Sequence, residues 1–529
     1  MICTNNNSGE KKMTNSQLQA YHQKELHSKL WKMANDLRGS MVGSEFQNYI
    51  LGMLFYRFLS DKTTFYIKDI LSVDGITYKD AWEIPEYKTA LIQTSLDELG
   101  YLIEPRHLFE SITELIYDDM FDIEIFIEAI KSLIDSTRGQ KSEKAFQGLF
   151  DDMDLHSTKL GKDVKSRSAL IGKIMTSIEE IHFTHLDTEI DILGSAYEYL
   201  ISMYSQQDSR SNGEFFTEIG ISTACVKLVT HDLEKVRSAY DPTSGSGGLL
   251  LGVRKHIKVG KLYGQEKISS TVSLSKMSLI LHGLDYNEFE IYNGDTLEDD
   301  HFAGEKFDIQ TSNPPYSIPY SASPKFLEDE RFAPYGTLAP KSKADWAFVQ
   351  HMIHHMADDG RIAVVLPHGV LFRGGSEGVI RRFIIEQYNY LDAVIGLPAG
   401  LFLSTKIPTL ILIFKKNRGE NKDNILFIDG SKDYEQGKNQ NRLRDEDIDK
   451  IVNTYIKRED VSKYSKKILL SEIADNDYNL NIPRYVDTFE EEERIDIELV
   501  NKEISEIDEK IQGIQSELKH YFDELGIFQ

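Results

Sequence analysis

The sequence has little of what defines secreted, cysteine-ligated or membrane proteins. Only two of its 529 residues are cysteines, Cys3 and Cys225, which excludes a disulfide framework and a zinc site built on cysteines and favours a reducing compartment. The longest apolar runs, such as Thr409–Phe414, have the length of a strand and fall short of the roughly 20 residues of a membrane helix. The first residues, MICTNNNSGEKK, lack the apolar core of a signal peptide. We therefore expect a cytoplasmic protein with a disordered leader over residues 1–16.

Basic residues are scarce relative to acidic ones. Lys and Arg number 60 and Asp and Glu number 85, which gives a formal net charge of −25. A protein of this charge does not hold nucleic acid by bulk attraction, because phosphate binding needs a local cationic surface. An enzyme that acts on nucleic acid through a partner or a small basic patch remains open. The chain is long enough for two to four domains.

The spacing of apolar residues changes near residue 206. Before it, apolar residues recur at intervals of three and four, which predicts a helical domain over residues 17–205. After it, strand-length apolar runs alternate with helical stretches, which predicts an α/β domain over residues 206–480 with a parallel sheet and helices on both faces. Ligands of such sheets bind at the carboxyl ends of the strands. The predicted strands are Lys261–Gln265, Glu290–Asn293, Phe307–Thr311, Arg361–Leu366, Leu391–Gly396, Thr409–Phe414 and Asn424–Ile428, and the helices between them include Leu249–Ile257, Ser270–His282, Asp345–Met356 and Ser376–Gln387.

Two segments depart from this alternation. Ser317–Lys343 is a long connection with four prolines, and connections of that length are usually functional or disordered. Residues 481–529 are predicted to form an acidic helical tail with an apolar seam over four heptads, a pattern that needs a partner helix. An amphipathic helix that lies on its own catalytic domain is the alternative. The seam consists of Ile497, Val500, Ile504, Ile507, Ile511, Ile514, Leu518, Tyr521 and Leu525.

The first motif with chemical content is DPTSGSGG at 241–248, followed by an apolar helix start. Its glycines allow a tight turn and a close approach of backbone to ligand, and the helix N-terminus offers free N–H groups. The Asp241 carboxylate repels phosphate but attracts an ammonium group, which favours a nucleoside that carries an amino acid over a dinucleotide. A plain Gly-rich turn is the alternative reading. The motif lacks the lysine of a Walker sequence, which argues against an ATPase.

Two acidic residues follow the next predicted strands. Glu266 comes about 20 residues after the Gly-rich loop, where a carboxylate commonly holds ribose hydroxyls. Asp295 follows the strand after that. Either acid alone is typical of a solvated loop, but one acid per strand end beside a Gly-rich loop favours a nucleoside site.

The tetrapeptide NPPY at 313–316 directly follows a predicted strand. The two prolines make the backbone rigid, so the side-chain oxygen of Asn313 and the carbonyl oxygen of Pro314 form a fixed pair of acceptors. Such a pair suits an exocyclic amine with two N–H groups, and the ring of Tyr316 suits stacking on a planar base. A stiff turn that closes the strand is the alternative.

DPTSGSGG, LYGQE, NGDTL and NPPY, in this order, resemble the S-adenosylmethionine-dependent amino-methyltransferases of DNA adenine. Gly213–Thr217 resembles the GEF(F/Y)TP element of that group. Segments over nearly the whole chain, among them LWKMANDLRGS, YILGMLFYRFLSDK, FQGLFDDMDL, DILGSAYEYLI, LPHGVLFRGGSEGVIR and DNDYNLNIPRYVD, are similar to the methylation subunit of type I restriction-modification systems.

The resemblance implies an α/β fold with a Rossmann-like catalytic domain that transfers a methyl group to N6 of a flipped adenine in duplex DNA, without a metal. It also implies a specificity subunit that binds two copies of this chain, and a restriction subunit that joins them. Asp241 and the Gly-rich loop would hold the methionine part of the cofactor, Glu266 its ribose and Asp295 its adenine. By resemblance, the cofactor-binding residues are Glu214, Phe215, Thr217, Asp241, Thr243, Gly245, Ser246, Gly247, Gly248, Glu266 and Asp295, and the catalytic residues are Asn313, Pro314, Pro315 and Tyr316.

Several further positions carry expectations of their own. Glu218 replaces the usual proline of the family, which we expect to alter the loop that carries Glu214 and Thr217, and Ser278 replaces an asparagine often found in relatives. His351, His354 and His355 have near-ligand spacing, but without the glutamate of an HExxH motif they are interpreted as a partly buried helix face. Basic residues near the predicted active face, Lys341, Lys343 and Arg373, are expected to contact the DNA backbone.

Two other functions remain open. NPPY methyltransferases also act on guanine amines of RNA and on glutamine side chains, although those enzymes do not resemble the N-terminal helical domain. A catalytically silent scaffold is the second alternative, and the complete set of motifs argues against it.

Overall fold

The computed structural model describes residues 43–181, 194, 197–201, 217–402, 405–438, 440–488 and 497–526. The predicted leader and the helical pattern before residue 43 lie outside these residues. The chain forms two compact units, Met1–Val486 and Asp487–Gln529, with a boundary just beyond the one predicted at residue 480. The domain limits at 16 and 205 remain predictions.

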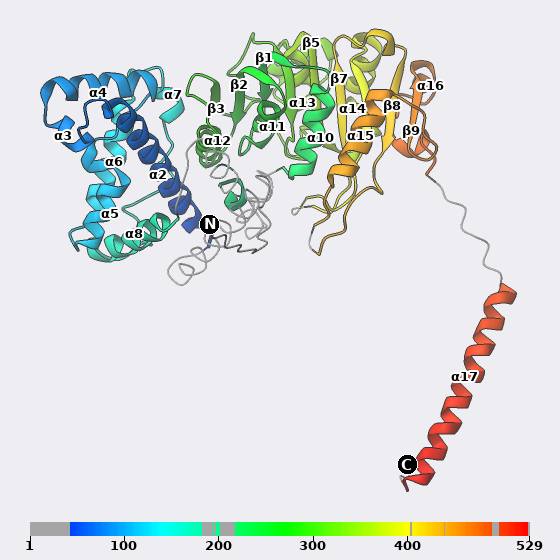
Figure 1. The fold of residues 1–529 in the computed structure, drawn as a ribbon. Helices are drawn as coiled ribbons and strands as arrows, with labels where there is room; N and C mark the ends of the chain where they lie inside the picture. The colour runs from blue at the N-terminus through cyan, green and yellow to red at the C-terminus, as the bar shows by residue number, and fades with distance from the viewer. Residues whose placement is uncertain are drawn as a thin grey trace, which may run out of the picture. The chain divides into compact units, whose positions relative to one another are not determined.

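The N-terminal region is helical, as the apolar spacing predicts (Figure 1). Local side chains set where two of its helices begin: the carboxylates of Asp122 and Asp163 accept backbone N–H groups of the first turn of α6 and α8. The buried faces of these helices carry residues such as Phe126 and Ile174. The helices are α2 (Gly43–Leu71), α3 (Tyr78–Trp82), α4 (Pro85–Glu98), α5 (Phe109–Tyr117), α6 (Ile123–Ser136), α7 (Glu143–Phe146) and α8 (Val164–Glu179).

The rest of the first unit is built on a nine-stranded sheet in the order β3-β2-β1-β4-β5-β7-β6-β8-β9. All seven predicted strands are confirmed, and β1 and β9 are additional. The strands are β1 (Lys235–Asp241), β2 (Lys258–Glu266), β3 (Phe289–Asn293), β4 (Phe307–Ser312), β5 (Met356–Pro367), β6 (Leu391–Gly396), β7 (Thr409–Lys415), β8 (Asn424–Asp429) and β9 (Ser465–Leu469).

The prediction of a purely parallel sheet is wrong at one end. Strands β1 to β5 pair in parallel, but β7 runs antiparallel to β5 and β6, and β9 runs antiparallel to β8. The described residues between β6 and β7 form no helix, and a strand without a helical crossover returns in the opposite direction. The strands that carry the predicted site therefore belong to the parallel half.

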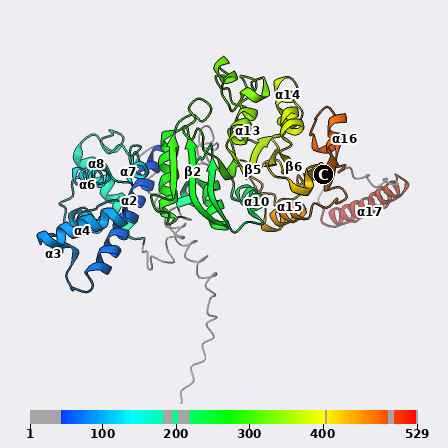
Figure 2. The ribbon, with the colours of Figure 1, turned by 90° about the horizontal axis from the view of Figure 1, so that it is seen from above.

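Helices cover both faces of the sheet, as predicted. Along β5, Ile362 and Val364 enter one apolar cluster while Ala363 and Val365 enter another, because alternate side chains point to opposite faces. Figure 2 shows α13 and α14 on one side of the sheet and α10 and α15 on the other. These helices are α10 (Ile219–Thr230), α11 (Gly248–His256), α12 (Ser269–Leu281), α13 (Asp345–His354), α14 (Ser376–Phe383), α15 (Asp445–Lys457) and α16 (Leu470–Asp475).

The N-terminal helices and the sheet domain share one apolar core. Polar contacts from α12 add to it: Ser273 Oγ donates to the carbonyl of Gly148 at 2.8 Å, and the buried Lys276 Nζ donates to the carbonyl of Lys144 at 2.7 Å. The two regions are thus packed together within the first unit.

The second unit contains one long helix, α17 (Ile497–Glu524), where the seam pattern predicts a helix. The described seam residues are exposed, from 39% for Val500 to 71% for Leu525. Among the described residues, no helix combines the length and apolar character that crossing a membrane requires.

Candidate active site

The loop after β1 is shaped by its glycines around a buried acid. Asp241 ends β1 with 1% of its surface exposed, and its carboxylate accepts the backbone N–H of Thr243 at 3.0 Å. Gly247 has φ of 84°, and a Cβ there would lie 2.8 Å from Ser275 Oγ, so a side chain does not fit. Burial, with a contribution from the nearby Glu266, raises the pKa of Asp241 to about 7. A plain turn would not need a buried carboxyl group at this place.

A second buried acid faces the same loop. Glu266 ends β2, and its carboxylate accepts the backbone N–H groups of Gly245 at 3.1 Å and Ile268 at 2.9 Å. Burial raises the pKa of Glu266, and these backbone hydrogen bonds oppose that shift. The structure therefore brings together Asp241, Glu266 and the Gly-rich loop, as the sequence predicts.

Asp295 follows β3 and is more exposed than the other two acids. Its carboxylate accepts the N–H of Leu297 at 3.1 Å and forms an ion pair with Lys267 Nζ at 2.9 Å. The adjacent Thr296 donates its hydroxyl to the carbonyl of Pro242 at 2.5 Å, which ties this loop to the Gly-rich loop. All three predicted acids thus lie on loops at the carboxyl ends of neighbouring parallel strands.

The NPPY segment follows β4, the next strand of the parallel half. The Tyr316 hydroxyl donates to Asn313 Oδ1 at 2.6 Å, and Asn313 Nδ2 donates to Thr217 Oγ1 at 3.3 Å. The ring of Tyr316 packs edge-on against Phe402, with centroids 5.8 Å apart. The oxygen predicted to accept a hydrogen bond from an amine thus already accepts one from the Tyr316 hydroxyl, and an amide oxygen can accept a second.

One side-chain contact connects the Gly-rich loop to the NPPY segment. Thr243 Oγ1 and Ser312 Oγ lie 2.7 Å apart, and Ser312 directly precedes Asn313. Two motifs about 70 residues apart in the sequence therefore meet at adjacent strand ends. The sequence shows the order of these motifs along the chain but does not predict this contact.

The segment before the Gly-rich loop is described from Thr217 onward, and Glu214 and Phe215 lie outside the described residues. Glu218 caps α10: its carboxylate accepts the N–H of Ile221 at 3.0 Å. The unusual glutamate thus starts a helix. Ser278 is buried within α12, where its carbonyl hydrogen bonds to His282 Nδ1.

The three basic residues predicted to contact DNA have different surroundings. Lys341 is exposed and Lys343 is half-buried. The Arg373 guanidinium instead forms ion pairs with the buried carboxylates of Asp345 at 3.0 Å and Glu377 at 3.2 Å. Its charge is therefore already neutralised inside the protein.

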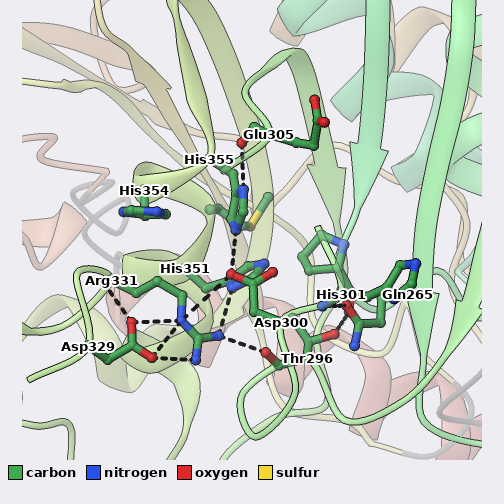
Figure 3. Close-up of polar contacts among 12 residues, drawn as sticks. Gln265, Thr296, Asp300, His301, Glu305, Asp329, Arg331, His351, His354 and His355 are labelled. Atoms are coloured by element: carbon green, nitrogen blue, oxygen red, sulfur yellow. Dashed lines mark hydrogen bonds and ion pairs between the residues drawn. The ribbon is translucent and has the colours of Figure 1, made fainter. Parts of the chain in front are cut away.

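Two of the three histidines at the end of α13, His351 and His355, belong to a hydrogen-bonded cluster (Figure 3). His355 is fully buried between the Glu305 carbonyl, 2.8 Å from Nδ1, and the Asp300 carboxylate, 3.0 Å from Nε2. His351 Nε2 lies 3.0 Å from the Tyr240 hydroxyl. Burial, together with neighbouring positive charge, lowers the pKa of His351 well below its ordinary value, so this ring is neutral at pH 7.

Asp300, His351 and His355 place potential metal-ligand atoms within 4.8 Å of one another, but the guanidinium group of Arg331 already lies beside them. Arg331 is 5% exposed, and it donates to His351 Nδ1 at 3.2 Å and to the carbonyl of Thr296 at 2.8 Å. Its guanidinium also pairs with Asp329 (Figure 3). The permanent charge beside His351 disfavours a second cation, so we interpret the cluster as a buried ion network that holds the loop after Asp295.

The donor set of the loops after β1, β2 and β4 fits an amino-acid-bearing nucleoside. Asp241 can bind an ammonium group once it is ionised, and Glu266 can accept hydrogen bonds from ribose hydroxyls. Ser244 Oγ, in the same loop, is buried and has no hydrogen-bond partner among the described residues, which leaves it available to a ligand. Such a ligand would lie beside Asn313.

Comparison with known proteins points in the same direction. The family model of the N-6 DNA methylases matches residues 188–494, and the family model of the HsdM N-terminal domain matches residues 26–178. The chain is 35% identical to the methylase subunit of the type I restriction enzyme MpnII from Mycoplasma pneumoniae, over 95% of this chain and 96% of the relative. It is 34% identical to the MjaVII methylase subunit from Methanocaldococcus jannaschii, over 67% of this chain and 63% of the relative. The crystal structure of a type I restriction-modification methyltransferase subunit from Streptococcus thermophilus has a TM-score of 0.81 and 38% identity, and the match covers 88% of this chain and all of that one.

Proposed function

The chain belongs to the N-6 DNA methylase family, as a type I methylase subunit, and we propose that it uses S-adenosylmethionine to methylate N6 of an adenine in duplex DNA. The observation that carries the proposal is the contact between Thr243 and Ser312, which brings the predicted cofactor loop against the NPPY segment. Methylation of chromosomal DNA would place the protein in the cytoplasm.

The residues of the first three strand ends would hold the cofactor. Asp241 would bind the ammonium group of its methionine part, Glu266 its ribose hydroxyls and Asp295 its adenine. The backbone of the Gly-rich loop lets the ligand approach closely, because Gly245 and Gly247 both adopt positive φ. The cofactor supplies a methyl group on a positively charged sulfur, which is already strongly electrophilic.

Asn313 and Pro314 would activate the amine. The nitrogen lone pair of adenine N6 is delocalised into the ring, so the amine is a weak nucleophile. Hydrogen bonds from its two N–H groups to Asn313 Oδ1 and to the Pro314 carbonyl would localise the lone pair as the nitrogen attacks. As the nitrogen bonds to the methyl carbon, the carbon–sulfur bond would break and leave a neutral thioether, and the cationic nitrogen would then lose a proton to water. Because no strong base is needed, positioning would supply much of the rate enhancement. The base must leave the duplex to reach these groups, and Tyr316 would turn from Asn313 to stack on it.

The exposed seam of α17 supports assembly with another subunit. Its apolar stripe is long enough for a coiled-coil contact, and the acidic composition of residues 486–529 favours a partner with basic helices over a second copy of α17. We propose that this partner is the specificity subunit, which would bind two copies of the chain and supply DNA recognition, and that a restriction subunit joins them.

Truncation after Val486 tests this role of the tail. We expect the truncated chain to bind cofactor like the full chain, because the predicted cofactor residues all precede Val486, but not to co-elute with the specificity subunit. Size-exclusion chromatography with light scattering measures this. A truncated chain that still forms the stoichiometric complex would refute the tail as the docking element.

The reaction itself is tested by product analysis. The chain is combined with a specificity subunit, duplex DNA and S-adenosylmethionine labelled in the methyl group, and the DNA is then digested to nucleosides. The proposal predicts label in N6-methyldeoxyadenosine alone. Label in another nucleoside, in RNA or in protein would contradict it.

A further inference from the structure

The residue after the NPPY segment has an unusual backbone that one buried carboxylate holds in place. Ser317 has φ of 51°, a region that residues other than glycine rarely adopt. Its N–H donates to Asp345 Oδ1 at 2.7 Å, and its hydroxyl donates to Asp345 Oδ2 at 3.1 Å. Asp345 is the first residue of α13 and is 1% exposed. Both oxygens of this carboxylate are therefore directed at the residue next to Tyr316.

The charge of Asp345 is balanced by an arginine from another loop. Arg373 Nη1 lies 3.0 Å from Asp345 Oδ2 and 3.2 Å from Glu377 Oε1, and Arg373 Nη2 lies 3.4 Å from Ser317 Oγ. Burial raises the pKa of Glu377, and Arg373 opposes this shift. One guanidinium thus bridges two buried carboxylates and the strained serine.

The four residues come from segments that follow adjacent strands. Ser317 follows β4, Arg373 follows β5, Asp345 begins α13, and Glu377 lies in α14. A cluster that joins these segments restricts movement of the NPPY loop relative to the sheet, because a buried ion pair with ideal partners is costly to separate.

We propose that Asp345 is a positioning residue which, together with Arg373 and Glu377, holds Ser317 and thereby places Asn313 and Tyr316 for methyl transfer. This inference rests on the proposed function. It assigns Arg373 to the catalytic loop, in place of the DNA backbone contact that the sequence suggests. Two carboxylates surround the one guanidinium, so the cluster has no surplus positive charge to attract a phosphate.

The two roles of Arg373 differ in what a mutation changes. Loss of a phosphate contact weakens DNA binding and reduces its dependence on salt, while the rate from bound DNA is kept. Loss of a positioning contact slows the transfer step while cofactor and DNA still bind, because a small displacement of a reacting group costs up to about 100-fold in rate.

The experiment uses the chain assembled with its specificity subunit and measures single-turnover methylation at saturating DNA and cofactor. We expect Asp345→Asn and Arg373→Met to slow methylation by about 10- to 100-fold. Cofactor affinity from calorimetry and the salt dependence of DNA binding should stay at wild-type values. Arg382→Met is the matched control, because the exposed Arg382 of α14 pairs with Glu386 in the π-helical segment Ile384–Tyr388 that follows, and it should methylate at the wild-type rate.

Several results would overturn the proposal. A wild-type rate for Asp345→Asn would do so, as would an Arg373→Met enzyme that shows weaker DNA binding and a reduced salt dependence but transfers normally. If Asp345→Asn no longer binds cofactor, Ser317→Ala tests the proposal instead, because this variant removes only the hydroxyl group. Slower methyl transfer by Ser317→Ala with normal cofactor binding supports the proposal, and a wild-type rate refutes it. A wild-type complex that does not methylate DNA would instead refute the proposed function.

Discussion

The loops on the two sides of the candidate site are held by different means. On the cofactor side, after β1 and β2, the acids Asp241 and Glu266 are held mainly by backbone N–H groups of short adjoining loops. On the target side, after β4 and β5, the NPPY loop is held by side-chain charges that come from three separate segments. The first arrangement uses backbone groups, the farthest being Gly245, 21 residues before Glu266, whereas the second uses side chains up to 56 residues apart in the sequence.

This difference suggests how the two halves of the site respond to mutation. A backbone-held acid can be changed with its loop left in place, so the loss should appear in cofactor binding. A loop held by a network of side chains can be displaced by changes far from it in sequence, so the loss should appear in transfer. The contact between Thr243 and Ser312 is where the two halves meet.

The largest expected effect comes from replacing Asn313, which should impair methyl transfer but not cofactor binding. Asn313→Ala removes one of the two acceptors for the amine, and we expect methylation to fall by about 100- to 1,000-fold, the cost of losing one such polar group in comparable sites. Cofactor affinity should be nearly unchanged. Asn313→Asp is the matched control, because it keeps an acceptor oxygen and should be more active than the alanine variant. Turnover of the alanine variant near the wild-type rate, measured by transfer of labelled methyl groups, would contradict the mechanism.

Asp241 should affect the cofactor side and do so with a pH signature. Its pKa of about 7 in the free protein means that the carboxyl group is partly protonated near neutrality. A bound ammonium group favours the ionised form, so binding releases a proton below that pH. Cofactor affinity should therefore rise as pH increases toward about 7 and level off above it.

Asp241→Asn should bind the cofactor about 10- to 100-fold more weakly, the worth of a hydrogen bond to a charged group, and should lose the pH dependence between about pH 5.5 and 7.5. Calorimetry in two buffers of different ionisation enthalpy counts the released protons. An unchanged pH profile in the asparagine variant would show that another group is responsible.

The smallest expected effect concerns the start of α10. Glu218→Ala removes the side-chain cap and should lower the free energy of unfolding by about 1 kcal/mol. Glu218→Gln keeps an acceptor oxygen and serves as the control. Urea unfolding of both variants measures the difference, and equal stability of the alanine variant and the wild type would show that the cap is energetically unimportant.

The sequence predicted the cofactor side better than the target side for a physical reason. The Gly-rich loop, Glu266 and NPPY are single residues or short contiguous motifs that directly follow predicted strands, so their spacing in the sequence is enough to locate them. The cluster of Asp345, Arg373 and Glu377 forms only when β4 and β5 pair, and no local pattern marks it. Arg373 was therefore interpreted by its charge alone, as a DNA contact.

Two features of the sheet escaped prediction for similar reasons. Only the last four residues of β1 are buried, so KVRSAYD shows no apolar run that would mark a strand. Strand β7 is buried except at Lys415 and has the same apolar pattern in either direction. Its antiparallel pairing goes with a connection from β6 whose described residues form no helix. The prediction that the three histidines form a partly buried helix face is confirmed, but Arg331, the partner of His351, lies in the long connection and is not marked by a helical pattern.

The most direct test of this account is a calorimetric titration of S-adenosylhomocysteine, a stable cofactor analogue, into the full chain without DNA or partner subunits. Because the described cofactor-side residues lie within one unit and contact one another there, we predict saturable binding of one ligand per chain, weakened in Asp241→Asn and unchanged in Asn313→Ala. The prediction is contradicted if the wild-type chain does not bind the analogue, or if both variants lose affinity equally. Either result would mean that the cofactor side is not complete without the target side.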